Sequence, residues 1–275
     1  MVKNVALVDN ELQGKEYKGN QGGSGFGKFG ELPKPKVLDW NIGNGIEYFV
    51  GSHNGFENIG VQYSRQVINV ENDFWIVKDN FKSENEHTYK QVWQGHYSLE
   101  KAPNLIRSTF DDATGLDIYQ LNAVDGVESS GKRGKQWTVV SKKQQGDFSF
   151  STIIFPYKGF DNRIDELAKA PMLKGWKINN SDWKIEEENA TTLSKGEEII
   201  VISAKKIVFN NLVIESNEEG DFIIKMKDKK VTIQSISEKE LQLTITGVKD
   251  CTLNGVSGNA NFQISTGNIL ECKIE

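Results

Sequence analysis

The chain has 275 residues, enough for one large or two ordinary domains, and 10% of them are aromatic. Its net charge of -5, from 33 basic and 38 acidic residues, argues against a general nucleic-acid binder. No apolar run reaches the ~18 residues of a membrane span, and the first residues lack the apolar core of a signal peptide. We therefore expect no nucleic-acid partner and no membrane span.

The start of the chain reads as short strands and a glycine-rich loop. Strand-like segments lie at residues 4–9, 37–41 and 46–50. The loop, residues 19–30, matches two phosphate-binding spacings. Pro33 and Pro35 follow it, however, and prevent the helix start that either motif needs, so nucleotide binding is not expected.

Residues 60–97 carry strong strand signals and predict a meander of three strands. Apolar and polar residues alternate over 61–67, which is typical of a half-buried strand. The apolar run at 74–77 predicts a strand covered on both faces. Alternation returns at 88–94, where a glutamine stands between two aromatic residues.

The remainder predicts an all-β fold. Further strand-like segments lie at 107–110, 116–121, 137–140, 148–155, 198–203, 206–215, 221–226, 230–235, 241–246, 261–265 and 269–274. Pro156 is expected to end the strand before it, and 164–170 is a short helical stretch. We place a boundary there, which gives a two-part all-β protein with one part over residues 1–160 and the other over residues 161–275.

The three histidines, His53, His87 and His96, lie in or beside the meander. His87 and His96 stand at opposite ends of one strand, roughly 25 Å apart at ~3.3 Å per residue, so they cannot share a metal ion. Asp79 and His87 flank one turn and are expected to form a surface pair. His96 is expected to be a packed or edge histidine, because no nearby carboxylate orients it. The residues thus predict no metal ligand and no catalytic group.

His53 and Arg65 are the candidate substrate-binding residues. His53 lies in Ser52-His53-Asn54, predicted to be a loop, where functional residues concentrate. Arg65 lies in mid-strand. An ion pair with Asp79 or a neighbouring glutamate is the simpler interpretation. The functional one is contact with an anionic substrate, since the guanidinium suits carboxylate and sulfate.

Tryptophans and cysteines leave alternatives open. The six tryptophans are suited to stacking on sugar rings, but strand tryptophans usually belong to a core; they are Trp40, Trp75, Trp93, Trp137, Trp176 and Trp183. Cys251 and Cys272, the only two cysteines, fit either a disulfide or two buried thiols, and they cannot form a zinc site alone.

Segments 52–56, 63–67, 74–79 and 86–89, followed by His96, resemble the β-sheet part of heparinase II/III-like polysaccharide lyases. The family pattern is roughly "S-H-D-G-Y … H-x-R-x-V … Y-W-[IL]-V-x-D … G-x-H-x-Y". In addition, the opening Lys3-Asn4-Val5-Ala6-Leu7-Val8-Asp9-Asn10 with Gln13 is similar to the family's "[HK]-N-x-x-L-V-D-G-x-x-Q" segment. Order and approximate spacing agree over residues 3–97, and Thr152 to Pro156 fits a later family strand loosely.

The resemblance implies a helical α/α toroid followed by a central, large antiparallel β-sandwich (supersandwich-like), here residues 1–160, and a smaller C-terminal β-sandwich domain, here residues 161–275. Such enzymes cleave uronic-acid polysaccharides by β-elimination. A base removes the proton α to the carboxylate, and an acid protonates the leaving glycosidic oxygen. Tyrosine and histidine typically do this work, with asparagine or histidine neutralising the carboxylate.

This sequence departs from the family pattern in several places. The toroid and the "H-x-H-x-D" segment are missing, Lys3 stands where some members have histidine, and Tyr63 stands where histidine is common. The resemblance therefore implies the C-terminal β portion of a lyase, inactive alone and with no catalytic residue carried over.

The implied partners are an acidic polysaccharide and the missing toroid, and the implied location of the parent is periplasmic or secreted. No cofactor is expected in this chain, and the resemblance leaves open a zinc or calcium ion in the full-length parent. The alternative is a non-catalytic carbohydrate-binding or structural β-sandwich. A lone zinc or calcium hydrolase is disfavoured by the histidine spacing.

Overall fold

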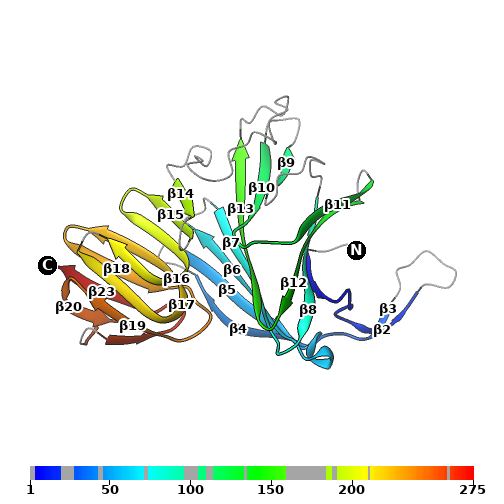
Figure 1. Cartoon of the computed structure of the whole chain (residues 1–275), viewed down its shortest axis with the longest axis horizontal. Helices are drawn as coiled ribbons and strands as arrows, with labels where there is room; N and C mark the ends of the chain where they lie inside the picture. Colours follow the sequence, from blue (N-terminus) through cyan, green and yellow to red (C-terminus); the bar gives the residue numbers. More distant parts are fainter. Residues whose placement is uncertain are drawn as a thin grey trace. The chain divides into compact units, whose positions relative to one another are not determined.

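The computed structural model describes residues 4–19, 28–42, 46–70, 74–95, 105–109, 114–132, 135–158, 184–187, 191–209, 211–258 and 261–275. The chain divides into two compact units, residues 1–169 and 170–275. Both are built from antiparallel β-sheets, which confirms the predicted all-β class with β-sandwich organisation (Figure 1). The predicted boundary after residue 160 and the predicted helix at 164–170 lie outside the described residues.

The first unit is a set of antiparallel strands with one 3-10 turn, Glu57–Ile59. Its described strands are β1 (Val5–Val8), β2 (Lys15–Lys18), β3 (Lys28–Glu31), β4 (Pro35–Asn41), β5 (Ile46–His53), β6 (Gln62–Val70), β7 (Phe74–Lys82), β8 (Glu86–Gln94), β9 (Leu105–Thr109), β10 (Thr114–Gln120), β11 (Gly126–Lys132), β12 (Lys135–Gln145) and β13 (Phe148–Lys158).

Two sheets of the first unit enclose one core. The smaller has the order β1-β8-β12-β11, and the larger has the order β4-β5-β6-β7-β13-β10-β9 (Figure 1). Strands β2 and β3 form a separate hairpin. The core cluster joins Tyr89 and Trp93 of the smaller sheet to Phe81, Phe150 and Ile118 of the larger. Burial of these aromatic and aliphatic side chains holds the two sheets face to face.

The predicted three-stranded meander is wrong in its last step. Strands β6 and β7 pair in antiparallel register, but β8 joins the other sheet, where it lies between β1 and β12. The second neighbour of β7 is β13, from later in the chain. Period-2 alternation identifies a strand and its buried face, but it contains no information about which strand lies beside it.

Several predicted boundaries also need correction. Pro156 does not end β13, which continues to Lys158, with Pro156 opposite Leu116 of β10. The register with β7 ends at Ile154, so Pro156 lies where β13 has β10 as its one described neighbour, a position at which a strand tolerates proline. Residues 28–30, predicted as loop, belong to β3. Strand β11 was not predicted.

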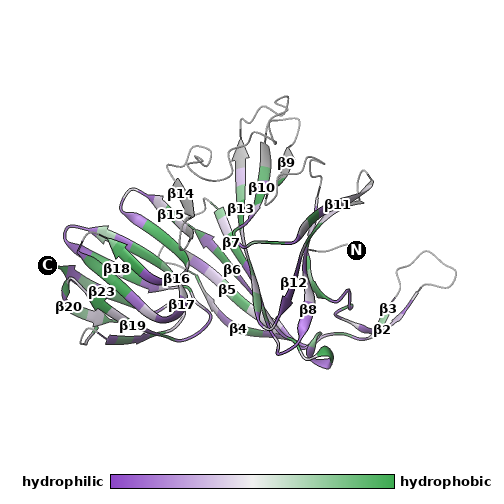
Figure 2. Cartoon of the chain, viewed as in Figure 1, coloured by the Kyte–Doolittle hydropathy of each residue, from purple (hydrophilic) through white to green (hydrophobic). Residues whose placement is uncertain are grey.

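The second unit is formed by the strands that follow residue 183. They are β14 (Lys184–Glu187), β15 (Thr191–Lys195), β16 (Glu198–Phe209), β17 (Leu212–Lys227), β18 (Lys230–Ser235), β19 (Leu241–Thr246), β20 (Val248–Leu253), β21 (Val256–Ser257), β22 (Asn261–Ile264) and β23 (Ile269–Ile274). Apolar and polar positions alternate along several of them (Figure 2). The polar stretches 217–220 and 227–229 each predict a turn between strands, but residues 217–220 lie inside β17.

A single continuous sheet wraps the core of the second unit. The first half of β17 pairs with β19 and its second half with β18, so this long strand belongs to both arms of the sheet. Ile233 and Leu270 from one arm and Leu243 and Ile264 from the other share a buried cluster. None of the described residues belongs to a helix that is long and apolar enough to cross a lipid bilayer.

The two cysteines form a disulfide. Cys251 of β20 and Cys272 of β23 lie on neighbouring strands and are bonded to each other. Both are buried, at 7% and 3% exposure. Of the two arrangements that the sequence left open, the structure therefore has the disulfide.

Candidate functional site

The carboxylate of Asp79 is completely buried and lies at the centre of a network of polar side chains in the first unit. Arg65, opposite it on β6, donates from Nε to Oδ1 at 2.6 Å and from Nη2 to Oδ2 at 2.7 Å. Tyr63 donates its hydroxyl to Oδ1 at 2.6 Å. This two-pronged Arg–carboxylate geometry is the strongest form of such a pair, and the tyrosine hydroxyl adds to it.

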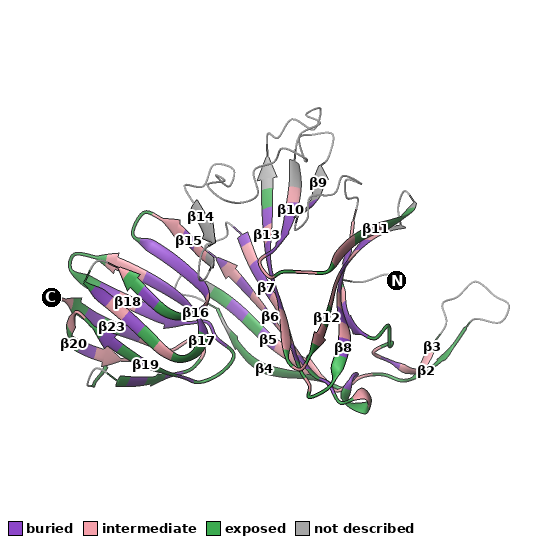
Figure 3. Ribbon diagram, viewed as in Figure 1, coloured by how far each residue is buried: buried purple, intermediate pink, exposed green. Residues whose placement is uncertain are grey.

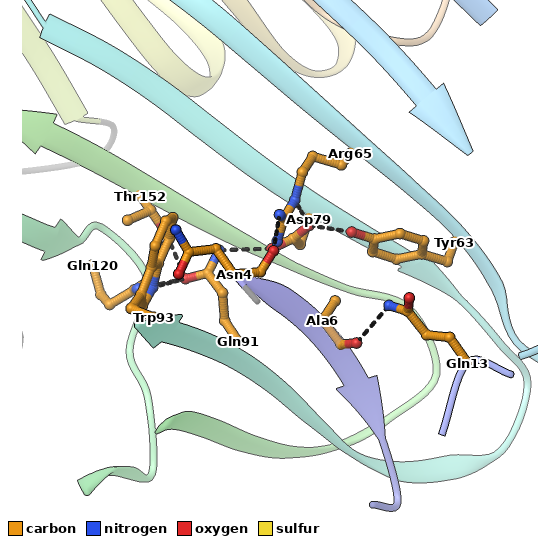
Figure 4. Close-up of polar contacts among 10 residues, drawn as sticks. All are labelled: Asn4, Ala6, Gln13, Tyr63, Arg65, Asp79, Gln91, Trp93, Gln120 and Thr152. Atoms are coloured by element: carbon orange, nitrogen blue, oxygen red, sulfur yellow. Dashed lines mark hydrogen bonds and ion pairs between the residues drawn. The ribbon is translucent and has the colours of Figure 1, made fainter. Parts of the chain in front are cut away.

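The same carboxylate is connected to the opposite sheet (Figure 4). Gln91 of β8 donates its Nε2 to Asp79 Oδ2 at 2.7 Å. Its Oε1 accepts hydrogen bonds from Trp93 Nε1 at 2.9 Å, Gln120 Nε2 at 2.7 Å and Thr152 Oγ1 at 2.9 Å. Because each of these groups has a partner, the cluster avoids the cost of an unsatisfied buried polar atom and fixes how the two sheets face each other.

The opening segment of the chain is tied into this cluster. Arg65 Nη1 donates to the backbone oxygen of Asn4 at 3.0 Å, and Asn4 Oδ1 accepts the amide of Gln94 at 2.6 Å. Gln13 donates its Nε2 to the backbone oxygen of Ala6 at 2.9 Å (Figure 4). These bonds hold β1 and the turn after it against β8 and β6.

His53 lies beside the cluster on β5, opposite Tyr63, with ring centroids 4.6 Å apart. Its Nδ1 accepts the backbone amide of Gly55 at 3.0 Å, which leaves the hydrogen of the neutral ring on Nε2. That Nε2 is buried and has no hydrogen-bond partner among the described residues. Contrary to the prediction of a loop, Ser52 and His53 belong to β5.

Burial and the neighbouring charges set the ionisation of these groups. Burial, together with the Arg65 cation, lowers the pKa of His53, so the imidazole is neutral near pH 7. Burial and the Asp79 charge raise the pKa of Tyr63 well above its ordinary value. Burial by itself lowers the pKa of Arg65, but Asp79 outweighs it and the net pKa is raised. Tyr63 and Arg65 therefore keep their protons, and neither acts as a base.

His87 has a different partner from the one predicted. Its Nδ1 lies 2.6 Å from Oδ2 of Asp9, and its Nε2 lies 3.1 Å from the hydroxyl of Ser83. The expected surface pair with Asp79 does not exist, since Asp79 points into the sandwich and bonds Arg65. Asp9 also accepts the amide of Thr88 at 2.8 Å, which ties the end of β1 to β8.

Of the three histidines, His96 lies outside the described residues. Within the described ranges, no group of three or more His, Cys, Asp or Glu side chains is arranged to hold a metal ion. Of the predicted substrate-binding pair, His53 and Arg65 lie on the same face of the larger sheet, joined through Tyr63.

The exposed aromatic residues of β4 and β5 are the other feature of this face. Trp40 is 64% exposed and Phe49 is 43% exposed, and the two stand directly opposite in the register. Strand β4 is exposed along most of its length (Figure 3). The expectation that strand tryptophans are core residues holds for Trp93, at 4% exposure, but not for Trp40.

Sequence reasoning missed the amide and hydroxyl side chains that complete the cluster. Gln91, Gln120 and Thr152 are each fully buried. The signal was present at Gln91, a glutamine between two aromatic residues on the core face of a strand. For Gln120 and Thr152 the sequence contains no comparable signal, because neither lies between two aromatic residues of its own strand.

No family model matches the sequence, and no curated protein matches it. Solved structures that match this chain include a heparan sulfate lyase from Pedobacter heparinus, with TM-score 0.44 and 17% identity over 62% of this chain. A heparinase III has TM-score 0.41 and 10% identity over 84% of the chain. A chondroitin AC lyase from Streptomyces coelicolor has TM-score 0.38 and 8% identity over 90%.

The chain spans only a part of each of these proteins. It covers 28% of the heparan sulfate lyase, 28% of the heparinase III and 37% of the chondroitin AC lyase. These likenesses concern the fold alone.

Proposed function

We propose that this chain is the C-terminal β-sheet portion of a heparinase II/III-like polysaccharide lyase, which cleaves uronic-acid polysaccharides by β-elimination. In this proposal the chain has no lyase activity of its own. It supplies one wall of the substrate cleft and supports an α/α toroid that precedes it in the whole enzyme.

One observation carries the proposal: the residues that match the family pattern contact one another. Asn4, Arg65 and Asp79 form a continuous chain of hydrogen bonds, although they come from three separate motif segments. Asp9 and His87, from the opening and last segments, form a second contact. A chance match of scattered letters gives no reason for these positions to meet, whereas a shared structural role does.

The chemistry of the described residues agrees with a supporting role. β-Elimination needs a base that takes the proton α to the carboxylate and an acid that protonates the leaving oxygen. His87, held between Asp9 and Ser83, and Tyr63, held beside Asp79, are each only 7% exposed and lie within the fold rather than on an open face. The proposal therefore assigns the acid and base to residues outside this chain and gives His53 and Arg65 a part in holding the anionic substrate.

A zinc ion of the parent is not assigned to the part of the chain that the structure describes. Protein zinc sites usually have three or more converging His, Cys or carboxylate ligands, and the described residues offer no such group. In our proposal an ion of the whole enzyme is held by other residues, and no step of this chain depends on it.

The disulfide supports a periplasmic or secreted location for the parent. Disulfides form and persist in oxidising compartments and are rare in the cytosol. Cys251 and Cys272 are joined within the core of the second unit, so the proposal places folding of this unit outside the cytosol.

An elimination assay tests the proposal. The chain alone and the chain joined to the product of the coding sequence upstream of it are each incubated with heparan sulfate, chondroitin or alginate. We expect the ultraviolet absorbance of unsaturated uronate to appear only with the joined protein. Product from the isolated chain would overturn its inactivity, and an upstream sequence without a toroid or an "H-x-H-x-D" segment would overturn the lyase assignment.

A non-catalytic carbohydrate-binding module is the second candidate, and the exposure of Trp40 and Phe49 favours it. Binding of oligosaccharide without any product, by the joined protein as well as by the chain, would support this candidate over the lyase.

A further inference from the structure

The exposed apolar surface of the first unit is concentrated on one edge of the larger sheet. Six large apolar side chains between residues 32 and 49 are exposed; they are Leu32, Val37, Leu38, Trp40, Ile42 and Phe49. Strand β4, which carries three of them, is the last described strand on that side of the sheet. Such a concentration marks an interaction surface rather than the scattered exposure that is ordinary for single residues.

The strand register places this surface next to Arg65. Phe49 lies between Trp40 and Val67, while Gly51 lies between Val37 and Arg65. Residues directly opposite in an antiparallel pair share a face of the sheet. The aromatic pair and the guanidinium therefore belong to the same face, in neighbouring rows.

Gly51 has no side chain, and the edge of the Phe49 ring occupies the space above it. A Cβ at position 51 would stand 2.7 Å from Cε1 and Cζ of Phe49, closer than side-chain atoms approach. The ring thus occupies the space that any other residue at 51 would fill, in the row that leads to Arg65. Phe49 therefore leans along β5 toward the row of Arg65, with Trp40 opposite it on β4.

A cationic and an anionic residue lie at opposite ends of this face. At the Arg65 end, 22% of the arginine side chain is exposed, whereas its partner Asp79 is fully buried, so the arginine is the charged residue of this pair that solvent or a ligand reaches. Glu47 lies at the other end of β5, where it accepts a hydrogen bond from Asn69 Nδ2 at 3.2 Å. Gly51 stands four positions after Glu47, about 13 Å along an extended strand.

We propose that Trp40 and Phe49 form a sugar-binding platform for an acidic polysaccharide, with a carboxylate or sulfate of the sugar directed to Arg65. The apolar face of a pyranose ring stacks on the aromatic rings, and the hydroxyls lie toward Glu47 and Asn69. The acidity of the polymer rests on the proposed function, while the platform rests on the geometry of this face.

Calorimetric titration of the chain with size-defined heparan sulfate, chondroitin and alginate oligosaccharides tests the platform. We expect binding by the wild type and a loss of about tenfold or more in affinity for Trp40→Ala and Phe49→Ala. Gly51→Ala is expected to weaken binding without removing an aromatic ring, because its methyl group displaces Phe49. The matched control is Tyr17→Ala, which removes an aromatic ring that is 54% exposed on β2.

Thermal unfolding of each variant verifies that it is folded, and sedimentation measures its oligomeric state. No binding by the wild type, or equal losses for Tyr17→Ala and Trp40→Ala, would overturn the platform. A dimer that Trp40→Ala converts to a monomer, without oligosaccharide binding, would make this face an interface between copies of the chain and overturn it as well. The lyase assignment is decided separately by product release from the joined protein.

Discussion

At the scale of single residues, Arg65 combines the two interpretations that the sequence allowed. Its bonds to Asp79 satisfy the ion-pair interpretation. The same bonds fix the guanidinium in one orientation at the edge of the covered part of the sheet, where 22% of the side chain remains exposed. A cation held in this way loses little conformational freedom when it meets an anion, so the structural role prepares the binding role that we propose.

The first prediction concerns the buried carboxylate. Asp79→Ala removes the acceptor for Arg65, Tyr63 and Gln91 and leaves a largely buried cation uncompensated. We expect the free energy of unfolding to fall by about 3–5 kcal/mol, measured by urea denaturation of the first unit. Glu86→Ala, which breaks an exposed pair with Lys143, is the control and should leave the unfolding midpoint unchanged. A similar small effect of both substitutions would contradict the role given to Asp79.

The second prediction concerns pH and His53. Its pKa is lowered in the folded state by burial and by Arg65, whereas the unfolded chain titrates near ~6.5. Below about pH 7 the unfolded state binds more protons than the folded state, so acidification destabilises the fold until the folded pKa is passed.

Denaturation of wild type and His53→Gln at several values between pH 8 and pH 5 measures this effect. We expect the stability of the wild type to fall more steeply with decreasing pH than that of the variant. Parallel curves for the two proteins would show that His53 is not the neutral, buried group described.

At the scale of elements, the two units use their long-range contacts differently. In the first unit, β8 leaves its sequence neighbour β7 and is held in the opposite sheet by side chains, including Gln91 and Trp93. In the second unit, neighbouring strands β20 and β23 are joined by a covalent bond near the end of the chain. Strand β20 has the two-residue strand β21 as its other neighbour, so the disulfide adds a covalent link where the strand pairing is short.

The third prediction follows from that bond. The disulfide closes a segment with a sequence separation of 21, for which loop-closure entropy predicts roughly 3 kcal/mol of stabilisation. We expect the double variant Cys251→Ala/Cys272→Ala to lose about this amount in denaturation of the second unit. Reduction of the wild type should produce the same loss, and reduction of the variant none. An unchanged midpoint on reduction would show that the bond does not stabilise the unit.

At the scale of the whole molecule, each unit has a core of its own. One cluster joins the two sheets of the first unit, and a separate one fills the folded sheet of the second. A unit with its own core meets the main condition for folding alone.

The fourth prediction is that residues 170–275 fold as an isolated protein. The core cluster and the disulfide both lie entirely within this range. We expect a single cooperative unfolding transition and protected amides in strands β16 to β19, measured by circular dichroism and hydrogen exchange. A fragment without a cooperative transition would show that the second unit needs residues of the first.

Much of the strand content was predictable from local signals. The apolar patterns identified strands at 230–235 and 241–246 with the bounds that the structure has. The second strand alternates strictly between buried and exposed residues, which is the signal that such a pattern predicts. The positive φ angles at Asp228 and Lys229 fit the turn predicted over 227–229. The expectation that Pro156 ends β13 was wrong, because a proline interrupts a strand only where the neighbouring strand needs its N–H for a hydrogen bond.

The sequence by itself determined the all-β class, most strands and the residues that match the lyase pattern. Only the tertiary structure decided that β8 leaves the meander, that Asp79 pairs with Arg65 rather than His87, and that Trp40 is exposed. The physical reason is the same in each case. A strand's periodicity is a property of a few successive residues, whereas its partners, its covering and the neutralisation of its charges depend on segments far away in the chain.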